Sequence, residues 1–232
     1  MNSTRQPNRW WVPAGLILLN LIPVIGGAFR VTELTGGADI TPGNERFFDS
    51  PAPVLIHIAS ATVYAFLGAF QFIPSFRRPQ KGRRSWHQLV GRILVPAGFL
   101  VALSGLWMTL FYALPPSDGV VLYILRLVFG TAMLAFLVLG ALDIRRRNFT
   151  GHGAWMTRAY AIAVGAGTQP LLLMIPELTS GPPDVTTRAL LIGAAWVINL
   201  GVAEYAISRR RLQLPARRTQ PKTLQPQQRT AP

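Results

Sequence analysis

Three histidines are the side chains of this sequence best suited to hold a haem, because the chain contains no cysteine. The lack of thiols excludes disulfides, thiolate zinc sites, iron–sulfur clusters and covalently attached c-type haem. A b-type haem between two helices needs two imidazoles at the same depth that face one another. His87 and His152 lie at the edges of two apolar segments on the same expected side of the membrane, so they are our candidates for a haem or quinone site. No separate metal site is predicted.

Six polar or charged side chains lie within apolar segments or at their edges, where burial in a bilayer is costly and therefore points to function or to pairing. They are His57, Gln71, Arg92, Arg158, Asn199 and Glu204. In the segment HIASATVYAFLGAFQF, four polar or small residues recur at helical spacing, namely His57, Tyr64, Gly68 and Gln71. They share one helix face, which we expect to turn toward the other helices. The alternative is that these side chains only bond to neighbouring helices and hold the bundle together.

The carboxylate of Glu204 needs a nearby cation if it is buried, and Arg158 or Arg92 is the expected partner from the same leaflet. On an ideal helix Asn199 points roughly 140° away from Glu204, so the two cannot serve one small site. The polar side chains concentrate toward one membrane face, with mainly His57 on the other. We therefore place any functional centre near the cytoplasmic side.

The elements that must position these side chains are helices that cross a membrane. Hydrophobic residues make up 50% of the chain and charged residues only 14%, whereas a soluble domain carries about 25% charged residues. Six apolar segments are long enough to span a bilayer, approximately 11–31, 52–76, 89–114, 119–142, 154–177 and 187–208. A spanning segment without sheet periodicity must be helical, because hydrocarbon offers no partner for free backbone groups. The predicted fold is all-α, a polytopic bundle of six transmembrane helices.

Basic residues are distributed unequally between the loops. They concentrate before the first segment and after the second, fourth and sixth, whereas the other side holds only Arg30, Arg46, Arg126 and Arg188. The excess predicts that both termini lie in the cytoplasm (N-in/C-in) and that Arg126 reaches for the outer surface. The net charge of +14 then indicates contact with anionic lipid head groups. Nucleic acid is not an expected partner, because the basic residues are scattered over separate loops.

The chain divides into three parts. Residues 1–51 are predicted as a first helix and an external loop, 52–208 as a five-helix membrane core, and 209–232 as a disordered basic cytoplasmic tail. The first segment also has the features of a signal peptide, since basic residues precede it and small residues follow. Its length and the interfacial Trp10 and Trp11 favour a retained helix.

Four blocks of sequence carry a resemblance to a known family. They are HIASATVYAFLGAFQF with Arg77 after it; His87 with Gly91 and Arg92; His152 with Trp155, Met156, Arg158, Ala159 and Tyr160; and Trp196 with Asn199, Leu200, Ala203 and Glu204. In this order, over about residues 53–208, the chain resembles a bacterial family of small membrane proteins catalogued as domain of unknown function number 2306. The resemblance implies the topology and a shortlist of residues but no reaction. Gln88 stands where the resemblance leads us to expect arginine.

Three functions are compatible with these features. The first is a non-catalytic module of the bacterial cytoplasmic membrane that binds lipid or assists the assembly of a membrane protein partner, and it requires the fewest assumptions. The second is a redox protein with a b-type haem or a quinone at His87 and His152. The third is a transporter for a small solute or for protons. No phosphate-binding glycine loop, HExxH motif or serine elbow supports an enzyme.

Overall fold

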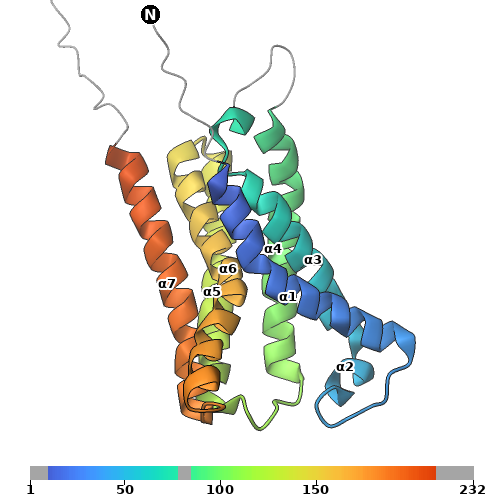
Figure 1. The fold of residues 1–232 in the computed structure, drawn as a ribbon. Helices are drawn as coiled ribbons and strands as arrows, with labels where there is room; N and C mark the ends of the chain where they lie inside the picture. Colours follow the sequence, from blue (N-terminus) through green and yellow to red (C-terminus); the bar gives the residue numbers. More distant parts are fainter. Residues whose placement is uncertain (1–9, 78–84, 213–232) are drawn as a thin grey trace, which may run out of the picture.

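The computed structural model describes residues 10–77 and 85–212, which form an all-helical bundle without strands in these ranges (Figure 1). The elements are α1 (Trp11–Gly36), α2 (Glu45–Asp49), α3 (Pro51–Phe70), the 3₁₀ helix η1 (Pro74–Arg77), α4 (Trp86–Phe111), α5 (Gly119–Arg145), α6 (Phe149–Thr179) and α7 (Val185–Leu212). Six of these helices are long and apolar enough to cross a membrane. The predicted six-helix class is therefore confirmed.

The helix boundaries differ from the predicted segments where local backbone chemistry decides them. The second segment was expected to continue to residue 76, but α3 ends at Phe70. Pro74 explains the early end, because a proline within a helix removes a backbone hydrogen bond and clashes with the carbonyl of the preceding turn. Conversely, α4 begins before the predicted residue 89, because Ser85 and Gln88 form a capping box at its N-terminus.

The expected external loop and the expected tail are also partly helical. α1 continues to Gly36, where Gly37 adopts a left-handed conformation (φ 69°) that closes the helix. α2 then forms within the predicted loop at Glu45–Asp49. α7 continues to Leu212, beyond the predicted end at residue 208, and the rest of the predicted tail lies outside the described residues.

The helices run alternately up and down, so that α1 begins and α7 ends at the same end of the bundle (Figure 1). We call this the terminal end, and we call the opposite end, which carries α2 and residues 112–118, the α2 end. α6 contacts α1, α3, α5 and α7, while α3 packs against α4 and α1. α6 therefore holds the two halves of the bundle together.

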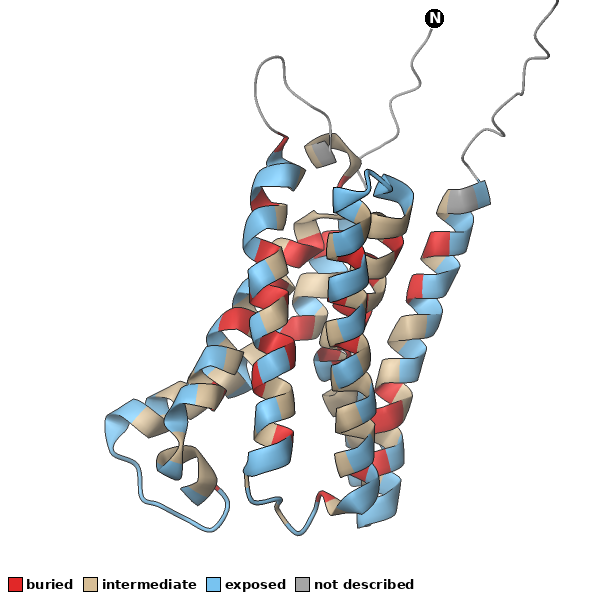
Figure 2. Ribbon diagram, turned by 180° about the vertical axis from the view of Figure 1, so that it is seen from behind, coloured by how far each residue is buried: buried red, intermediate tan, exposed pale blue. Residues whose placement is uncertain are grey.

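Apolar side chains cover the outside of the bundle as well as its core. Leu18, Ile25 and Phe29 of α1 are exposed, as are Leu190 and Val197 of α7, and Figure 2 shows exposed residues along the outer faces of the helices. In a membrane these faces contact lipid chains, which are as apolar as leucine.

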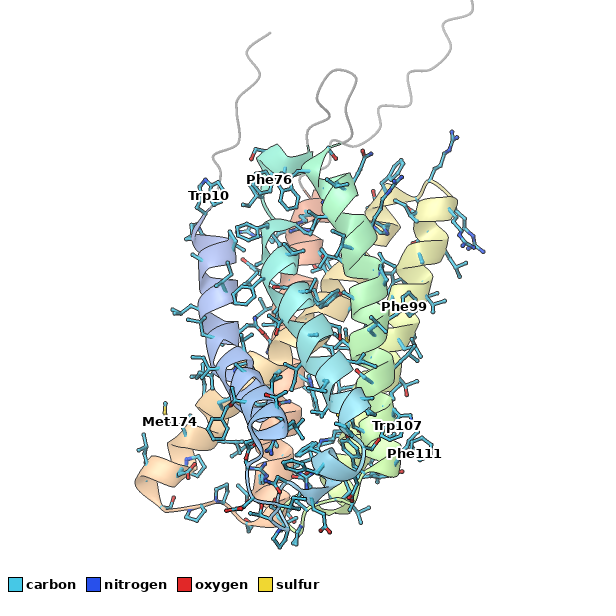
Figure 3. All side chains as sticks on the ribbon, turned by 90° about the vertical axis from the view of Figure 1, so that its right-hand side faces the viewer. Trp10, Phe76, Phe99, Trp107, Phe111 and Met174 are labelled. Carbon is cyan, nitrogen blue, oxygen red and sulfur yellow. The ribbon has the colours of Figure 1, made fainter. Side chains whose placement is uncertain are left out.

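Aromatic side chains mark both ends of the bundle (Figure 3). At the terminal end Phe76 contacts Trp10, with ring centroids 6.0 Å apart, and stacks on Trp86 at 5.6 Å. At the α2 end Trp107 contacts Phe111 at 5.1 Å. Aromatic rings are enriched at both membrane–water interfaces, so these two groups are consistent with the limits of the membrane-spanning part.

Small residues allow the helices to approach closely in the core. The ring of Tyr160 lies over Gly68, and its hydroxyl donates a hydrogen bond to the Ala65 carbonyl at 2.7 Å. A Cβ atom at Gly98 would lie 2.9 Å from the ring of Tyr64. At Gly167 of α6 a Cβ atom would meet the backbone carbonyl of Leu19 in α1. A backbone carbonyl cannot move aside as a side chain does, so this contact fixes α1 on α6.

Replacing Gly167 by alanine is expected to destabilise the bundle, because the added methyl group forces α1 away from α6. Overpacking of this kind costs about 1–3 kcal/mol. The measurement is the thermal unfolding of the purified protein in detergent. Gly153→Ala on the same helix is the matched control, since nothing lies within 4 Å of a Cβ atom there. Equal melting temperatures for the two variants would contradict the close approach.

Candidate functional site

A cavity of about 430 Å³ lies inside the bundle, in the half toward the α2 end. Its wall is formed by α1, α3, α4, α5 and α6, with contributions from α2, residues 112–118 and α7. Sites for small molecules in proteins have volumes of about 300–1,000 Å³. The cavity is therefore large enough for part or all of a small ligand.

The wall of the cavity is mainly apolar, although several polar residues contribute to it. Asn20 donates to the Leu16 carbonyl at 2.7 Å, and Thr109 donates to the Gly105 carbonyl at 2.8 Å. Thr62 makes the same kind of bond within its own helix. Because these donors are satisfied by carbonyls of the preceding turn, they add little polarity to the cavity.

His57 is the predicted site residue that lines this cavity. Its Nδ1 atom lies 3.0 Å from the hydroxyl oxygen of Ser104, and that hydroxyl donates its own hydrogen to the Leu100 carbonyl at 2.5 Å. The Ser104 oxygen must then accept from His57, which assigns the hydrogen of the neutral ring to Nδ1. In this tautomer Nε2 carries the lone pair. His57 thus offers a hydrogen-bond acceptor within a largely apolar wall.

At the α2 end, the part of the cavity lined by Arg46, Asp118 and Arg126, which we call its mouth, contains a buried carboxylate. The side chain of Asp118 is only 5% exposed, and its Oδ2 accepts a hydrogen bond from Nη1 of Arg126 at 2.7 Å. Its other oxygen, Oδ1, lies 3.7 Å from Nε of Arg188. Arg126, which was expected to reach for the surface, thus binds Asp118 near the beginning of α5. The two arginines compensate for the cost of burying this charge.

α2 places Arg46 and Phe47 beside this carboxylate, and both line the cavity. Burial lowers the pKa of Arg46 below its ordinary value, the positive charges of Arg30 and Arg126 lower it further, and Asp118 acts in the opposite direction. Tyr112 joins α4 to the start of α3 by donating a hydrogen bond to the Ser50 carbonyl at 2.6 Å. Its pKa is raised by burial, so the hydroxyl keeps its proton and this hydrogen bond near neutral pH.

The terminal end holds the ion pair that the sequence predicted for Glu204. Nε of Arg158 lies 2.5 Å from Oε1 of Glu204, and Nη2 donates to Oε2 at 2.9 Å. The pair is bidentate, and the guanidinium also lies over the ring of Trp155, 4.6 Å from its centroid. The Arg158 side chain is 16% exposed, whereas that of Glu204 is 50% exposed on the outer face of α7. The pair joins α6 to α7.

Asn199 has different neighbours from Glu204, as the angular separation on the helix predicts. Its Nδ2 group donates to the Thr168 hydroxyl at 2.8 Å and to the Ala195 carbonyl at 2.7 Å. Arg92 is exposed on α4, and Gln71 is the C-terminal cap of α3. The predicted polar residues are therefore distributed over separate contacts, and Arg158 and Glu204 among them are joined directly by hydrogen bonds.

The two histidines proposed as cofactor ligands lie on different helices. Nδ1 of His152 lies 2.8 Å from the Gly140 carbonyl, which can only accept, so this nitrogen carries a hydrogen. A metal-ligating histidine is commonly oriented in this way. His87 lies in the first turn of α4, and α4 shares no extended contact with α6, where His152 lies. The haem or quinone site stays a prediction, and no cluster of metal-ligating side chains occurs in residues 10–77 and 85–212.

The cavity lies in the opposite half of the bundle from the expected functional centre, and its mouth depends on residues that the sequence analysis did not select. Arg46, Phe47 and Asp118 lie between the spanning segments, where charged and aromatic residues usually face water. In the sequence, the one feature that could have pointed to Asp118 is that it is a single carboxylate immediately before α5. Its pairing with Arg126 eight residues later is not a contact of adjacent helical turns and depends on the loop conformation.

Arg158→Gln and Glu204→Gln should each lower the stability of the protein, and the double variant should be less destabilised than the sum of the two. We expect a coupling energy of about 1 kcal/mol, because the bidentate pair is only partly exposed. Chemical unfolding in mixed micelles measures the cycle, and Arg145→Gln, an exposed position, controls for the loss of one positive charge. Additive effects of the two substitutions would show that the ion pair does not stabilise the contact of α6 with α7.

The comparison with protein families agrees with the helical bundle and identifies the family to which the chain is related. A family described as "Predicted membrane protein (DUF2306)" matches residues 54–207, which include α4 to α6 and most of α3 and α7. No curated protein and no solved structure matches the chain. The match extends over more than half of the sequence, and the protein belongs to the DUF2306 family of predicted membrane proteins.

Proposed function

We propose that this integral membrane protein is a non-catalytic lipid-binding protein, which holds one amphipathic molecule in the cavity between α1, α3, α4, α5 and α6. The observation that carries the proposal is the combination of a 430 Å³ apolar cavity with a mouth that contains arginine side chains. A lipid-like molecule has the same two parts. Residues of α1, including Asn20 and Gly27, belong to the wall, so the proposal requires that the first helix is retained.

Binding is favoured over catalysis by the hydrogen bonds of the His57–Ser104 pair. In an activated serine the hydroxyl donates to the histidine, which then removes the proton. Here the hydroxyl of Ser104 donates to the Leu100 carbonyl instead. Ser104 is also buried and does not line the cavity. The pair therefore supports the orientation of the His57 ring.

Binding is also favoured over transport by the continuity of the helices. Many transporters bind their substrates at discontinuous membrane helices. α1, α4 and α6 continue through their internal prolines, Pro23, Pro96 and Pro170. The spanning helices of the described ranges thus provide a wall around a cavity and no unwound backbone at a substrate site.

We further propose that both termini lie in the cytoplasm (N-in/C-in) and that the protein spans the cytoplasmic membrane, so that the cavity mouth faces the outer leaflet. The run Arg145, Arg146 and Arg147 at the terminal end supports this orientation, because cytoplasmic loops carry an excess of basic residues. The same basic end is suited to anionic lipid head groups of the inner leaflet.

Filling the cavity should reduce lipid binding. Ala61 of α3 lines the cavity, and Ala61→Phe is expected to weaken the binding of hexadecanol to protein in a neutral detergent by about tenfold or more, since overfilling a packed space costs about 1–3 kcal/mol. Native mass spectrometry counts the bound ligands. Ala59→Phe on the same helix is exposed outside the cavity and should bind as the unsubstituted protein does. Equal binding by both variants would contradict binding in the cavity.

Cysteine labelling tests the orientation of the protein in the membrane. The chain contains no cysteine of its own, so only the introduced residue is labelled. Ala38→Cys lies at the α2 end, and Thr150→Cys lies near the start of α6 at the terminal end; both positions are exposed. A membrane-impermeant maleimide should label Ala38→Cys in intact cells and Thr150→Cys only after permeabilisation. The reverse pattern would place the cavity mouth on the cytoplasmic side.

A further inference from the structure

The charges near the cavity mouth do not balance. Glu33 pairs with Arg30, which leaves Asp118 as the carboxylate among Arg46, Arg126 and Arg188. These three guanidinium groups and Asp118 together carry a net charge of +2 (3 − 1). Glu45 and Asp49, which belong to α2 as Arg46 does, are exposed and form no ion pair with Arg46 in the described ranges. Asp118 already uses one oxygen for Arg126 and directs the other toward Arg188. The positive charge of Arg46 is therefore not neutralised by an ion pair in the described part of the chain.

Arg46 is held in place by an aromatic ring. Its Cζ atom lies 4.5 Å from the centroid of the Phe47 ring, and Cζ of Arg30 lies 4.4 Å from the same centroid. Phe47 also makes an edge contact with Tyr112, with centroids 5.4 Å apart. Cation–π contacts of this kind orient a guanidinium but do not use its N–H donors. No hydrogen-bond acceptor for Arg46 occurs in the ranges that the structure describes.

The free donors of Arg46 lie beside an apolar space. Arg46, Asp118 and Arg126 line the same cavity as Ala61, Val101 and other apolar side chains deeper in the bundle. Arg46 belongs to α2, outside the membrane-spanning helices. A ligand that fills the cavity therefore passes from an apolar wall to a region of excess positive charge at its mouth.

We propose that Arg46, with Arg126 beside it, is a head-group subsite that binds the carboxylate or phosphate monoester of a single-chain amphiphile whose apolar chain occupies the cavity. This inference rests on the proposed lipid-binding function and specifies its ligand class. The planar guanidinium fork matches both anions, because each presents two oxygen atoms to parallel N–H donors. His57, deeper in the wall, faces the chain and not the head group.

The test compares ligands that share a chain but differ in head-group charge. Binding of hexadecanoate, hexadecanol and inorganic phosphate is measured by native mass spectrometry of the full chain in neutral detergent. For Arg46→Gln we expect hexadecanoate to bind about tenfold more weakly, because a charge-assisted hydrogen bond is lost, and hexadecanol to bind unchanged. Arg46→Lys should retain an intermediate affinity, since it keeps the charge without the fork. Arg145→Gln, at an exposed position at the other end of the bundle, should leave both affinities unchanged.

The outcomes separate the two proposals. Equal binding of both ligands by the unsubstituted protein, with no effect of Arg46→Gln, overturns the head-group subsite and leaves the lipid-binding cavity standing. Failure of both chain ligands to bind the unsubstituted protein overturns the proposed function itself. Loss of hexadecanol binding in Arg46→Gln shows a structural role for the arginine and also overturns the subsite. Saturable binding of inorganic phosphate at the affinity of hexadecanoate overturns the requirement for an apolar chain.

Discussion

The fold depends on one constraint, which is that hydrocarbon offers no hydrogen-bond partner to a polar group. Backbone groups meet this constraint by forming the six long helices, and polar side chains meet it by bonding to carbonyls one turn earlier. Asn20, Ser60, Thr109 and Thr157 all make such bonds. Polar residues can therefore line or surround the cavity without making it a hydrophilic space. The few polar groups that remain available to a ligand then contribute most of the polar contacts that the ligand can make.

The sequence predicts the membrane-spanning helices because hydrophobicity is a local and additive property. It also narrows the partner of Glu204 to Arg158 or Arg92, because a carboxylate in a bilayer must find a cation and few cations lie at the same depth. Arg158 meets that need with two hydrogen bonds. Helix ends are harder to predict, since they depend on single residues such as Pro74 and on side-chain caps such as Ser85 and not on the average of a window.

The cavity and its mouth could not be predicted in the same way. A cavity results from the mismatch of side chains on several helices, and no single segment encodes it. The hydrogen bond between His57 and Ser104 joins α3 to α4, and its register follows from the close approach at Gly98 and Gly105. α2 is five residues long and has no apolar run, so hydropathy gives no reason to place Arg46 and Phe47 against the bundle.

The carboxylate of Asp118 holds Arg126 and Arg188 together at the mouth of the cavity. Without it, Arg126 and Arg188 would repel each other across a partly desolvated space, and the loop before α5 would lose its attachment. If a second carboxylate formed an ion pair with Arg46, the positive charge would be neutralised within the protein and an anionic ligand would gain little from it. One carboxylate stabilises the arginines as a group but leaves their excess charge in place. The excess lies where the apolar wall ends, and this gradient from apolar wall to cationic mouth is the physical basis on which we propose a ligand that is itself apolar at one end and anionic at the other.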